Sequence, residues 1–144
     1  MKEPVELIGI VIAAHQDLGP ALLRAAQGIV GPMEAVVALS LNYDEDPAAA
    51  RTGLEEAIRK LQRGAGVLIL TDMFGGTPTN MALPFLEEGK VEVLTGVNLP
   101  ILLKAHSARR GARLKELAAQ LKDYGARNIV LASEIWNARP RQAV

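Results

Sequence analysis

His15 and Asp72 have the types and the positions that covalent chemistry at a histidine requires. His15 directly follows the apolar run LIGIVIAA, residues 7–14, and Asp72 directly follows a second apolar run, VLILT, residues 67–71. A carboxylate bonded to one imidazole nitrogen fixes the tautomer of the ring and leaves the other nitrogen as a nucleophile. The two residues are therefore candidate catalytic residues, provided that the fold brings both runs side by side.

The segment Gly75-Gly76-Thr77-Pro78 lies a few residues beyond Asp72. Two glycines allow backbone conformations and close approaches that other residues do not. Thr77 is suited to cap a helix and Pro78 to occupy its first position. Such a helix start presents free N–H groups to a phosphate-sized anion. We therefore expect Gly75, Gly76 and Thr77 to bind phosphate, and the combination with His15 and Asp72 points to phosphoryl transfer through a phosphohistidine.

These residues must be positioned by alternating strands and helices. Apolar runs predict strands over 7–14, 35–41, 67–71, 91–94 and 129–132, and helical spacing predicts helices over 18–30, 47–62, 77–88, 100–107 and 112–124. Asp46 is expected to cap the second helix, and Pro84 to kink the third.

This alternation predicts an α/β fold with a doubly wound, mostly parallel sheet flanked by helices. Right-handed crossovers favour the strand order 2-1-3-4. Chemistry in such sheets collects at the carboxyl ends of the strands, where the winding reverses, which is between the first and third strands. Because neighbouring strands lie ~4.8 Å apart, a hydrogen bond between His15 and Asp72 is expected at this point.

Length, composition and charge restrict the possible classes. The 144 residues predict one domain, and the absence of cysteine excludes disulfides and thiolate metal sites. Sixteen basic and sixteen acidic residues argue against a nucleic-acid binder. No apolar stretch reaches the ~18 residues that a membrane span needs, so we expect a cytoplasmic protein without membrane insertion.

The charges are unevenly distributed along the chain. From Lys104 onward there are nine basic and three acidic residues, whereas residues 1–103 hold seven basic and thirteen acidic residues. This asymmetry is typical of solvated helix faces, and it also fits an acidic surface that meets a basic protein partner.

Other kinds of site have less support. The chain has no GxxxxGK[ST] loop and no GxGxxG after its first strand, which argues against the common nucleotide sites. Two histidines without cysteine make a poor metal-ligand set, although His15 with Asp17 or Asp72 remains a possible one. His106 lies on an expected helix and is interpreted as a surface or packing residue. We expect no metal and no cofactor.

Three segments carry a resemblance to a known family: GIVIAAH, LILTDMFGGTPTN and TGVNLPILL. Across residues 7–132 the chain resembles the enzyme IIA component of the mannose-type (mannose/fructose/sorbose) phosphoenolpyruvate-dependent sugar phosphotransferase system, or PTS. The resemblance implies that His15 accepts a phosphoryl group on Nε2 from the histidine phosphocarrier protein HPr and passes it to a IIB component, while Asp72 holds Nδ1. It also implies that Gly75, Gly76 and Thr77 lie close to the phosphate.

The resemblance further implies a homodimer in which a short antiparallel C-terminal strand, residues 129–132, is exchanged between subunits. We expect a single IIA domain over residues 1–135, a tail over 136–144, and a separate IIA polypeptide. Many relatives have glycine where this chain has Gln16, and the effect of that difference stays open, as does the sugar. Two alternatives also stay open: a regulatory module controlled by phosphorylation of His15 without sugar flux, and a sensor that binds an anion without transferring it.

Overall fold

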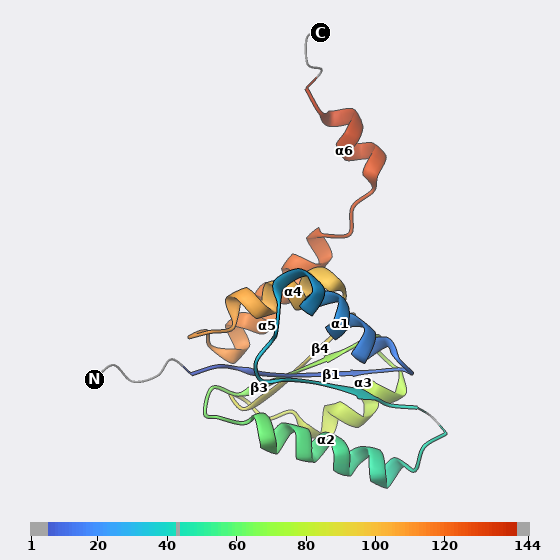
Figure 1. Ribbon diagram of the computed structural model, residues 1–144, viewed down its shortest axis with the longest axis vertical. Coiled ribbons are helices and arrows are strands. Elements are labelled where there is room, and N and C mark those ends of the chain that lie inside the picture. Colours follow the sequence, from blue (N-terminus) through green and yellow to red (C-terminus); the bar gives the residue numbers. More distant parts are fainter. Residues whose placement is uncertain (1–5, 43, 141–144) are drawn as a thin grey trace, which may run out of the picture.

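Four parallel strands form the centre of the protein in the computed structural model, which describes residues 6–42 and 44–140 (Figure 1). The strands are β1 (Gly9–Ala14), β2 (Val36–Ser40), β3 (Val67–Thr71) and β4 (Val91–Thr95). Their order across the sheet is β2-β1-β3-β4, and each neighbouring pair is parallel. The predicted sheet with order 2-1-3-4 is confirmed, and the winding reverses between β1 and β3.

Helices cover both faces of this sheet (Figure 1). One face is covered by α1 (Leu18–Val30), α4 (Leu99–Ala108) and α5 (Leu114–Arg127), and the other by α2 (Pro47–Leu61) and α3 (Thr77–Ala82). The start of α2 follows the prediction, because the Asp46 side chain accepts the N–H of Ala48 at 3.1 Å.

Strand β1 is apolar along its whole length because both of its faces are buried. Ile10 and Ile12 belong to the core on the side of α1, α4 and α5, whereas Val11 and Ala13 belong to the core on the side of α2 and α3. All four side chains are inaccessible to solvent. Covering a strand on both faces removes the alternation of apolar and polar residues, and it fixes the strand end that carries His15.

Helix α3 is shorter than predicted. It ends at Ala82 and is followed by a 3-10 turn over Leu83–Phe85, whereas the sequence predicts a kinked helix over 77–88. Pro84 has no N–H to donate, and its ring conflicts with the carbonyl four residues earlier. The proline therefore ends the helix instead of bending it.

The C-terminal segment also differs from the prediction. Residues 129–131 form neither strand nor helix, and α6 (Ala132–Ala138) stands away from the two layers (Figure 1). The side chains of Ile129 and Trp136 are 79% and 68% exposed. A strand needs a partner edge for its backbone groups, and the segment after α5 leads away from the sheet of its own chain, so no antiparallel fifth strand forms here. The last four residues of the expected tail lie outside the described residues.

A buried cation joins the amino ends of β1 and β2. Arg109, at the end of α4, is 2% exposed, and its Nη1 donates to the carbonyls of Ile8 at 3.1 Å and Ala35 at 3.2 Å. Its Nη2 donates to the carbonyl of Glu34. Burial lowers the pKa of Arg109; the charge of Glu34 opposes this shift, and the charge of Arg110 adds to it. The guanidinium nevertheless stays charged, because its ordinary pKa is very high.

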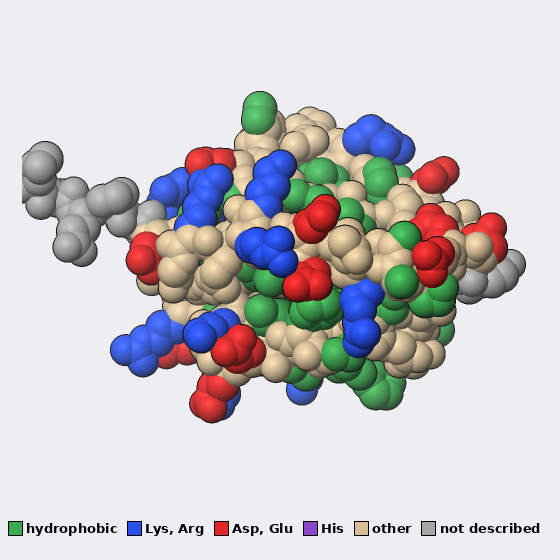
Figure 2. All heavy atoms as spheres, turned by 90° about the horizontal axis from the view of Figure 1, so that it is seen from below, with side chains coloured by type: hydrophobic (Ala, Val, Ile, Leu, Met, Phe, Trp, Pro, Cys, Tyr) green, Lys and Arg blue, Asp and Glu red, His purple; other side chains and the backbone are tan. Residues whose placement is uncertain are grey.

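The face that α2 covers carries charges of both signs (Figure 2). Basic and acidic side chains are interspersed on it, and acidic ones gather at the end near the loop after β2. That loop contains Asp44, Glu45 and Asp46, all of which are exposed. The acidic end of this face therefore lies at the carboxyl edge of the sheet. None of the helices in the described ranges has the length and apolar character needed to cross a membrane.

Candidate functional site

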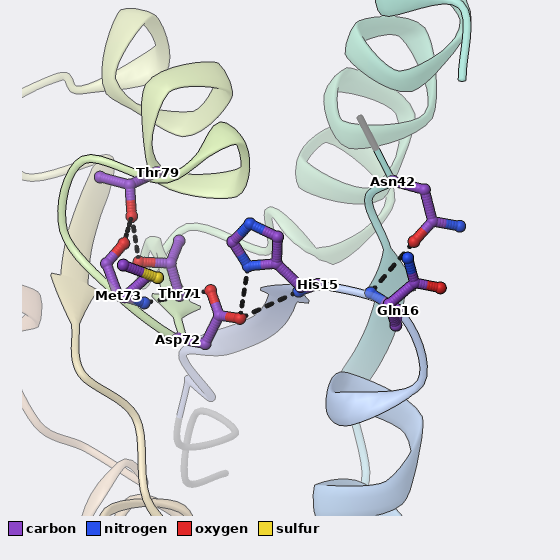
Figure 3. A network of polar contacts seen from close by, with 7 residues as sticks. All are labelled: His15, Gln16, Asn42, Thr71, Asp72, Met73 and Thr79. Carbon is purple, nitrogen blue, oxygen red and sulfur yellow. Dashed lines mark hydrogen bonds and ion pairs between the residues drawn. The ribbon is translucent and has the colours of Figure 1, made fainter. Parts of the chain in front are cut away.

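His15 and Asp72 meet at the reversal of winding, as expected from the strand order. Ala13 and Thr71 are paired in the register of β1 and β3, so the next turns of chain leave the sheet together. The Nδ1 atom of His15 lies 2.7 Å from Oδ2 of Asp72 (Figure 3). An ionised carboxylate can only accept hydrogen bonds, so Nδ1 carries the hydrogen and donates it to Asp72.

The carboxylate of Asp72 is held at both oxygens. Its Oδ2 also accepts the backbone N–H of His15 at 3.0 Å, and its Oδ1 accepts the N–H of Met73 at 3.0 Å. Burial alone would raise the pKa of Asp72, but the hydrogen bonds and the charge of His15 together lower it. Asp72 is therefore held ionised and oriented, with 11% of its side chain exposed against 33% for His15.

With Nδ1 bonded to Asp72, the nitrogen of His15 that remains for chemistry is Nε2. In Figure 3 this nitrogen is on the side of the ring that points away from Asp72. In the neutral ring with hydrogen on Nδ1, the free electron pair belongs to Nε2. The arrangement can therefore support nucleophilic attack by Nε2 while the carboxylate compensates positive charge on the ring.

The two glycines of the loop after β3 serve different purposes. Gly75 has φ +84°, a conformation that other residues rarely adopt, and nothing would contact a side chain there. Gly76 has an ordinary φ of −85°, but a Cβ atom on it would lie 2.8 Å from Cε1 and 3.4 Å from Nε2 of His15. Gly75 is needed for the turn, and Gly76 leaves the space that the imidazole occupies.

Thr77 does not have the capping position expected for it. Gly76 is the N-cap of α3, no side-chain capping bond is present, and Thr77 and Pro78 lie in the first turn. The N–H groups at a helix start have no helical partners, but α3 has only six residues, so its dipole is small. What this segment can offer to an anion is therefore its backbone N–H groups, and not a capping hydroxyl or a long helix.

Two buried threonines that the sequence argument did not single out hold the same loop. Thr79 Oγ1 lies 2.6 Å from the carbonyl oxygen of Met73 and 2.7 Å from Thr71 Oγ1 (Figure 3). Both threonine side chains are inaccessible to solvent. Thr71 directly precedes Asp72, and Thr79 ends the run LTDMFGGTPT, residues 70–79. The sequence gives no sign that the two hydroxyls meet, because that contact depends on how α3 folds back on β3.

Gln16 stands at a position where glycine has a physical advantage. Its φ of +50° lies in the left-handed region, which costs a residue with a side chain about 1 kcal/mol. Its N–H donates to Oδ1 of Asn42 at 3.0 Å, and Nδ2 of Asn42 donates to Oε1 of Glu45 at 3.1 Å. The turn after His15 is therefore fixed to the acidic loop after β2.

The surroundings of His15 are open, and part of them is apolar. Met73 and Phe74, which follow Asp72, are 55% and 75% exposed, and Leu18 at the start of α1 is 44% exposed. No group of three metal-binding side chains occurs in the part of the chain that the structure describes. His106 lies half-buried on α4.

A doubly wound parallel sheet with a carboxylate-bound histidine at its reversal point defines an α/β domain equipped for chemistry at one imidazole nitrogen. The model of the family described as "PTS system fructose IIA component" matches residues 9–122. The chain belongs to this family, the mannose-type IIA components of the sugar phosphotransferase system. Its role is accordingly that of a phosphocarrier in sugar transport, a transferase function that in general involves HPr and IIB components.

Individual relatives agree with this assignment. The chain is 32% identical over 129 residues to the PTS system fructose-specific EIIA component of Bacillus subtilis, covering 89% of this chain and 88% of that protein. It is also 32% identical over 103 residues to the mannose-specific EIIAB component of Escherichia coli, covering 71% of this chain and 32% of that longer protein. The crystal structure of phosphotransferase system component EIIA from Streptococcus agalactiae superimposes with a TM-score of 0.80 at 26% identity, over 89% of this chain and 99% of that one.

Proposed function

We propose that His15 is the phosphorylated residue of this phosphocarrier, and that it accepts the phosphoryl group on Nε2 from phosphorylated HPr and passes it to a IIB component. In the first step the electron pair of Nε2 forms a bond to phosphorus. The bond between phosphorus and the donor histidine of HPr breaks, and the donor nitrogen keeps that electron pair. Transfer to IIB is the same exchange with His15 as the donor.

The observation that carries this proposal is the 2.7 Å contact between His15 Nδ1 and Asp72 Oδ2. The hydrogen on Nδ1 stays in this bond through the transfer, so Nε2 is the reacting atom in both directions. The carboxylate offsets the positive charge that the ring gains when phosphorus binds. Gly75, Gly76 and Thr77 supply backbone N–H groups for the phosphate oxygens, in line with the role expected from their sequence.

The surface around His15 supports docking of a basic protein with an apolar patch. Phe74 and Met73 offer exposed apolar side chains beside the histidine. Acidic residues 44–46 lie at the same edge of the sheet. Opposite charges accelerate the encounter of two proteins, whereas apolar contacts contribute more to holding them together.

Labelling tests the proposal directly. The protein is incubated with radioactive phosphoenolpyruvate, enzyme I and HPr, and the label is mapped by mass spectrometry under non-acidic conditions. The expected product is an acid-labile phosphohistidine at His15 that is discharged when a IIB component is added. His15→Ala should abolish labelling, and Asp72→Asn should slow it without unfolding the protein.

His106→Ala is the matched control, because it removes the other histidine of the chain, and it should label like the wild type. Label on His106, or undiminished labelling of His15→Ala, would refute the assignment. Label on His15 that no IIB component discharges would favour the regulatory alternative.

We also propose that residues 129–132 form a short antiparallel strand in a homodimer, by pairing with the outer edge of β4 in a second copy. The IIA domain then spans residues 1–135, and residues 136–144 are its tail. The support is that Ile129, Val130 and Leu131 are 79%, 51% and 63% exposed, and that β4 is an edge strand. Exposed apolar side chains and unpaired edges favour association. A chain truncated after Asn128 should be monomeric by light scattering, whereas the intact chain should be dimeric; equal masses would refute the exchange.

A further inference from the structure

The two buried threonine hydroxyls behind the site form a chain of hydrogen bonds with a defined direction. A carbonyl oxygen cannot donate, so the single hydroxyl hydrogen of Thr79 must go to the carbonyl of Met73, 2.6 Å away. Thr71 must then donate to Thr79 across the 2.7 Å that separates their oxygens. Thr71 is the last residue of β3, so the chain begins on the fixed sheet.

This chain continues to the imidazole through Met73 and Asp72. The carbonyl of Met73 is held by Thr79, and its N–H donates to Oδ1 of Asp72 at 3.0 Å. Oδ2 of Asp72 accepts both from the backbone and from Nδ1 of His15. Figure 3 shows these residues in one connected network. Each hydrogen bond in it restricts the rotation of the next group.

Thr79 is the member that ties the helix to the loop. It lies in α3, but its hydroxyl bonds to a carbonyl six residues earlier instead of one in its own preceding turn. Among the side chains of α3 in the described structure, it is the one that hydrogen-bonds the loop between Asp72 and Gly76. Without that hydroxyl the Met73 carbonyl loses its donor, and the orientation of Asp72 is less restricted.

We infer that Thr79 is a positioning residue for phosphoryl transfer: through Met73 and Asp72 it sets the angle and the tautomer of His15. This inference rests on the proposed function, since it assumes that Nε2 of His15 is the reacting atom. The net stabilisation that one hydrogen bond gives in a protein corresponds to a roughly three- to tenfold change in rate when the bond acts on the transition state.

The test compares Thr79→Val, which keeps the shape and removes the hydroxyl, with Thr79→Ser, which keeps the hydroxyl. Transfer from phosphorylated HPr is followed by rapid quenching over a range of HPr concentrations. Thr79→Val should lower the maximal rate about three- to tenfold at an unchanged half-saturating HPr concentration, and Thr79→Ser should restore most of the rate. Thr52→Val is the matched control, because Thr52 is exposed and bonds only within α2 at 3.0 Å.

A double-mutant cycle separates positioning from a general loss of structure. If Thr79 acts through Asp72, then Thr79→Val should change the rate less than about twofold in an Asp72→Asn background. Nitrogen NMR of His15 should show a smaller fraction of the ring with hydrogen on Nδ1 in Thr79→Val than in the wild type. If Thr79→Val does not fold, the double-mutant cycle with Asp72→Asn is run with Thr71→Val instead. The expected loss of transfer rate is then smaller, because Thr79 keeps its bond to Met73.

Three results would overturn the inference: a wild-type rate in Thr79→Val, an equal loss with and without Asp72, or no recovery in Thr79→Ser. Failure of the proposed function has a different appearance. In that case the wild-type protein itself acquires no phosphate on His15, before any threonine is changed.

Discussion

The substitution Gly76→Ala should slow phosphoryl transfer strongly while changing the free energy of unfolding only slightly. A Cβ atom on residue 76 would lie 2.8 Å from Cε1 of His15 and 3.2 Å from Cγ of Met73. The backbone at this position, with φ −85° and ψ 167°, is one that alanine adopts readily. The added methyl group therefore conflicts with the imidazole and crowds the Met73 side chain, but it suits the backbone conformation of the loop.

The size of the effect follows from how far the ring must move. Relieving a 2.8 Å contact to an ordinary separation near 3.4 Å takes a shift of about 0.6 Å. The same shift would stretch the 2.7 Å bond from Nδ1 to Asp72 beyond the usual range for N–H···O bonds. Hydrogen bonds to charged groups contribute about 1.5–3 kcal/mol, so we expect phosphoryl transfer to slow by about tenfold to hundredfold.

Rapid-quench transfer from phosphorylated HPr, together with thermal unfolding, measures both quantities in one preparation. Gly76→Ala should lose transfer with a net change in stability of about 1 kcal/mol or less, because the restriction of the unfolded chain by alanine offsets part of the weakened His15–Asp72 bond. Gly75→Ala should instead lose about 1–2 kcal/mol of stability, since its φ is +84°.

Gly53→Ala, in the middle of α2 with nothing near an added Cβ, is a control that should leave transfer unchanged. Wild-type transfer by Gly76→Ala would show that the ring position described here is not the reacting one.

Three further outcomes follow from residues around the site. Gln16→Gly should stabilise the fold by about 1 kcal/mol and raise the melting temperature by about 2–4 °C, because residue 16 has φ +50°; an unchanged or lower melting temperature would contradict this. The pKa of Asp72 is lowered in the folded protein, so its contribution to stability is present above its ordinary value of 3.8 and is lost as the pH falls through the lower folded value. In denaturant titrations, the stability difference between wild type and Asp72→Asn should shrink in that acid range and stay constant at higher pH. Phe74→Ala, which removes a side chain that is 75% exposed, should raise the half-saturating concentration of phosphorylated HPr about tenfold with little change in maximal rate; a reduced maximal rate alone would argue against docking at Phe74.

The parts of the fold that the sequence predicted correctly are the buried, regular strands. Strands β1 and β3 are continuous apolar runs because helices cover both of their faces, so their ends could be located within a residue or two. Their neighbourhood follows from the winding rules for parallel sheets. These two facts together were sufficient to place His15 beside Asp72.

The features that escaped prediction depend on contacts between distant parts of the chain. The space that Gly76 leaves for the imidazole and the contact between the hydroxyls of Thr71 and Thr79 exist only after α3 has folded back on the sheet. The end of α3 before Pro84 was missed because a proline in a helical pattern can bend a helix or end it. The segment expected as a strand over 129–132 has a suitable composition, but after α5 it leads away from the sheet of its own chain and does not reach the free edge of β4 or β2.

The buried Arg109 has a consequence for the order in which the chain folds. Its guanidinium bonds backbone carbonyls 101 and 74 residues earlier, at Ile8 and Ala35. In a growing chain these two carbonyls therefore lack the guanidinium donor until α4 and Arg109 have been synthesised. Contacts of such sequence separation form slowly, because long loops must close first. We expect fragments that stop before residue 109 to lack a cooperative unfolding transition, although they already contain all four strands, His15 and Asp72.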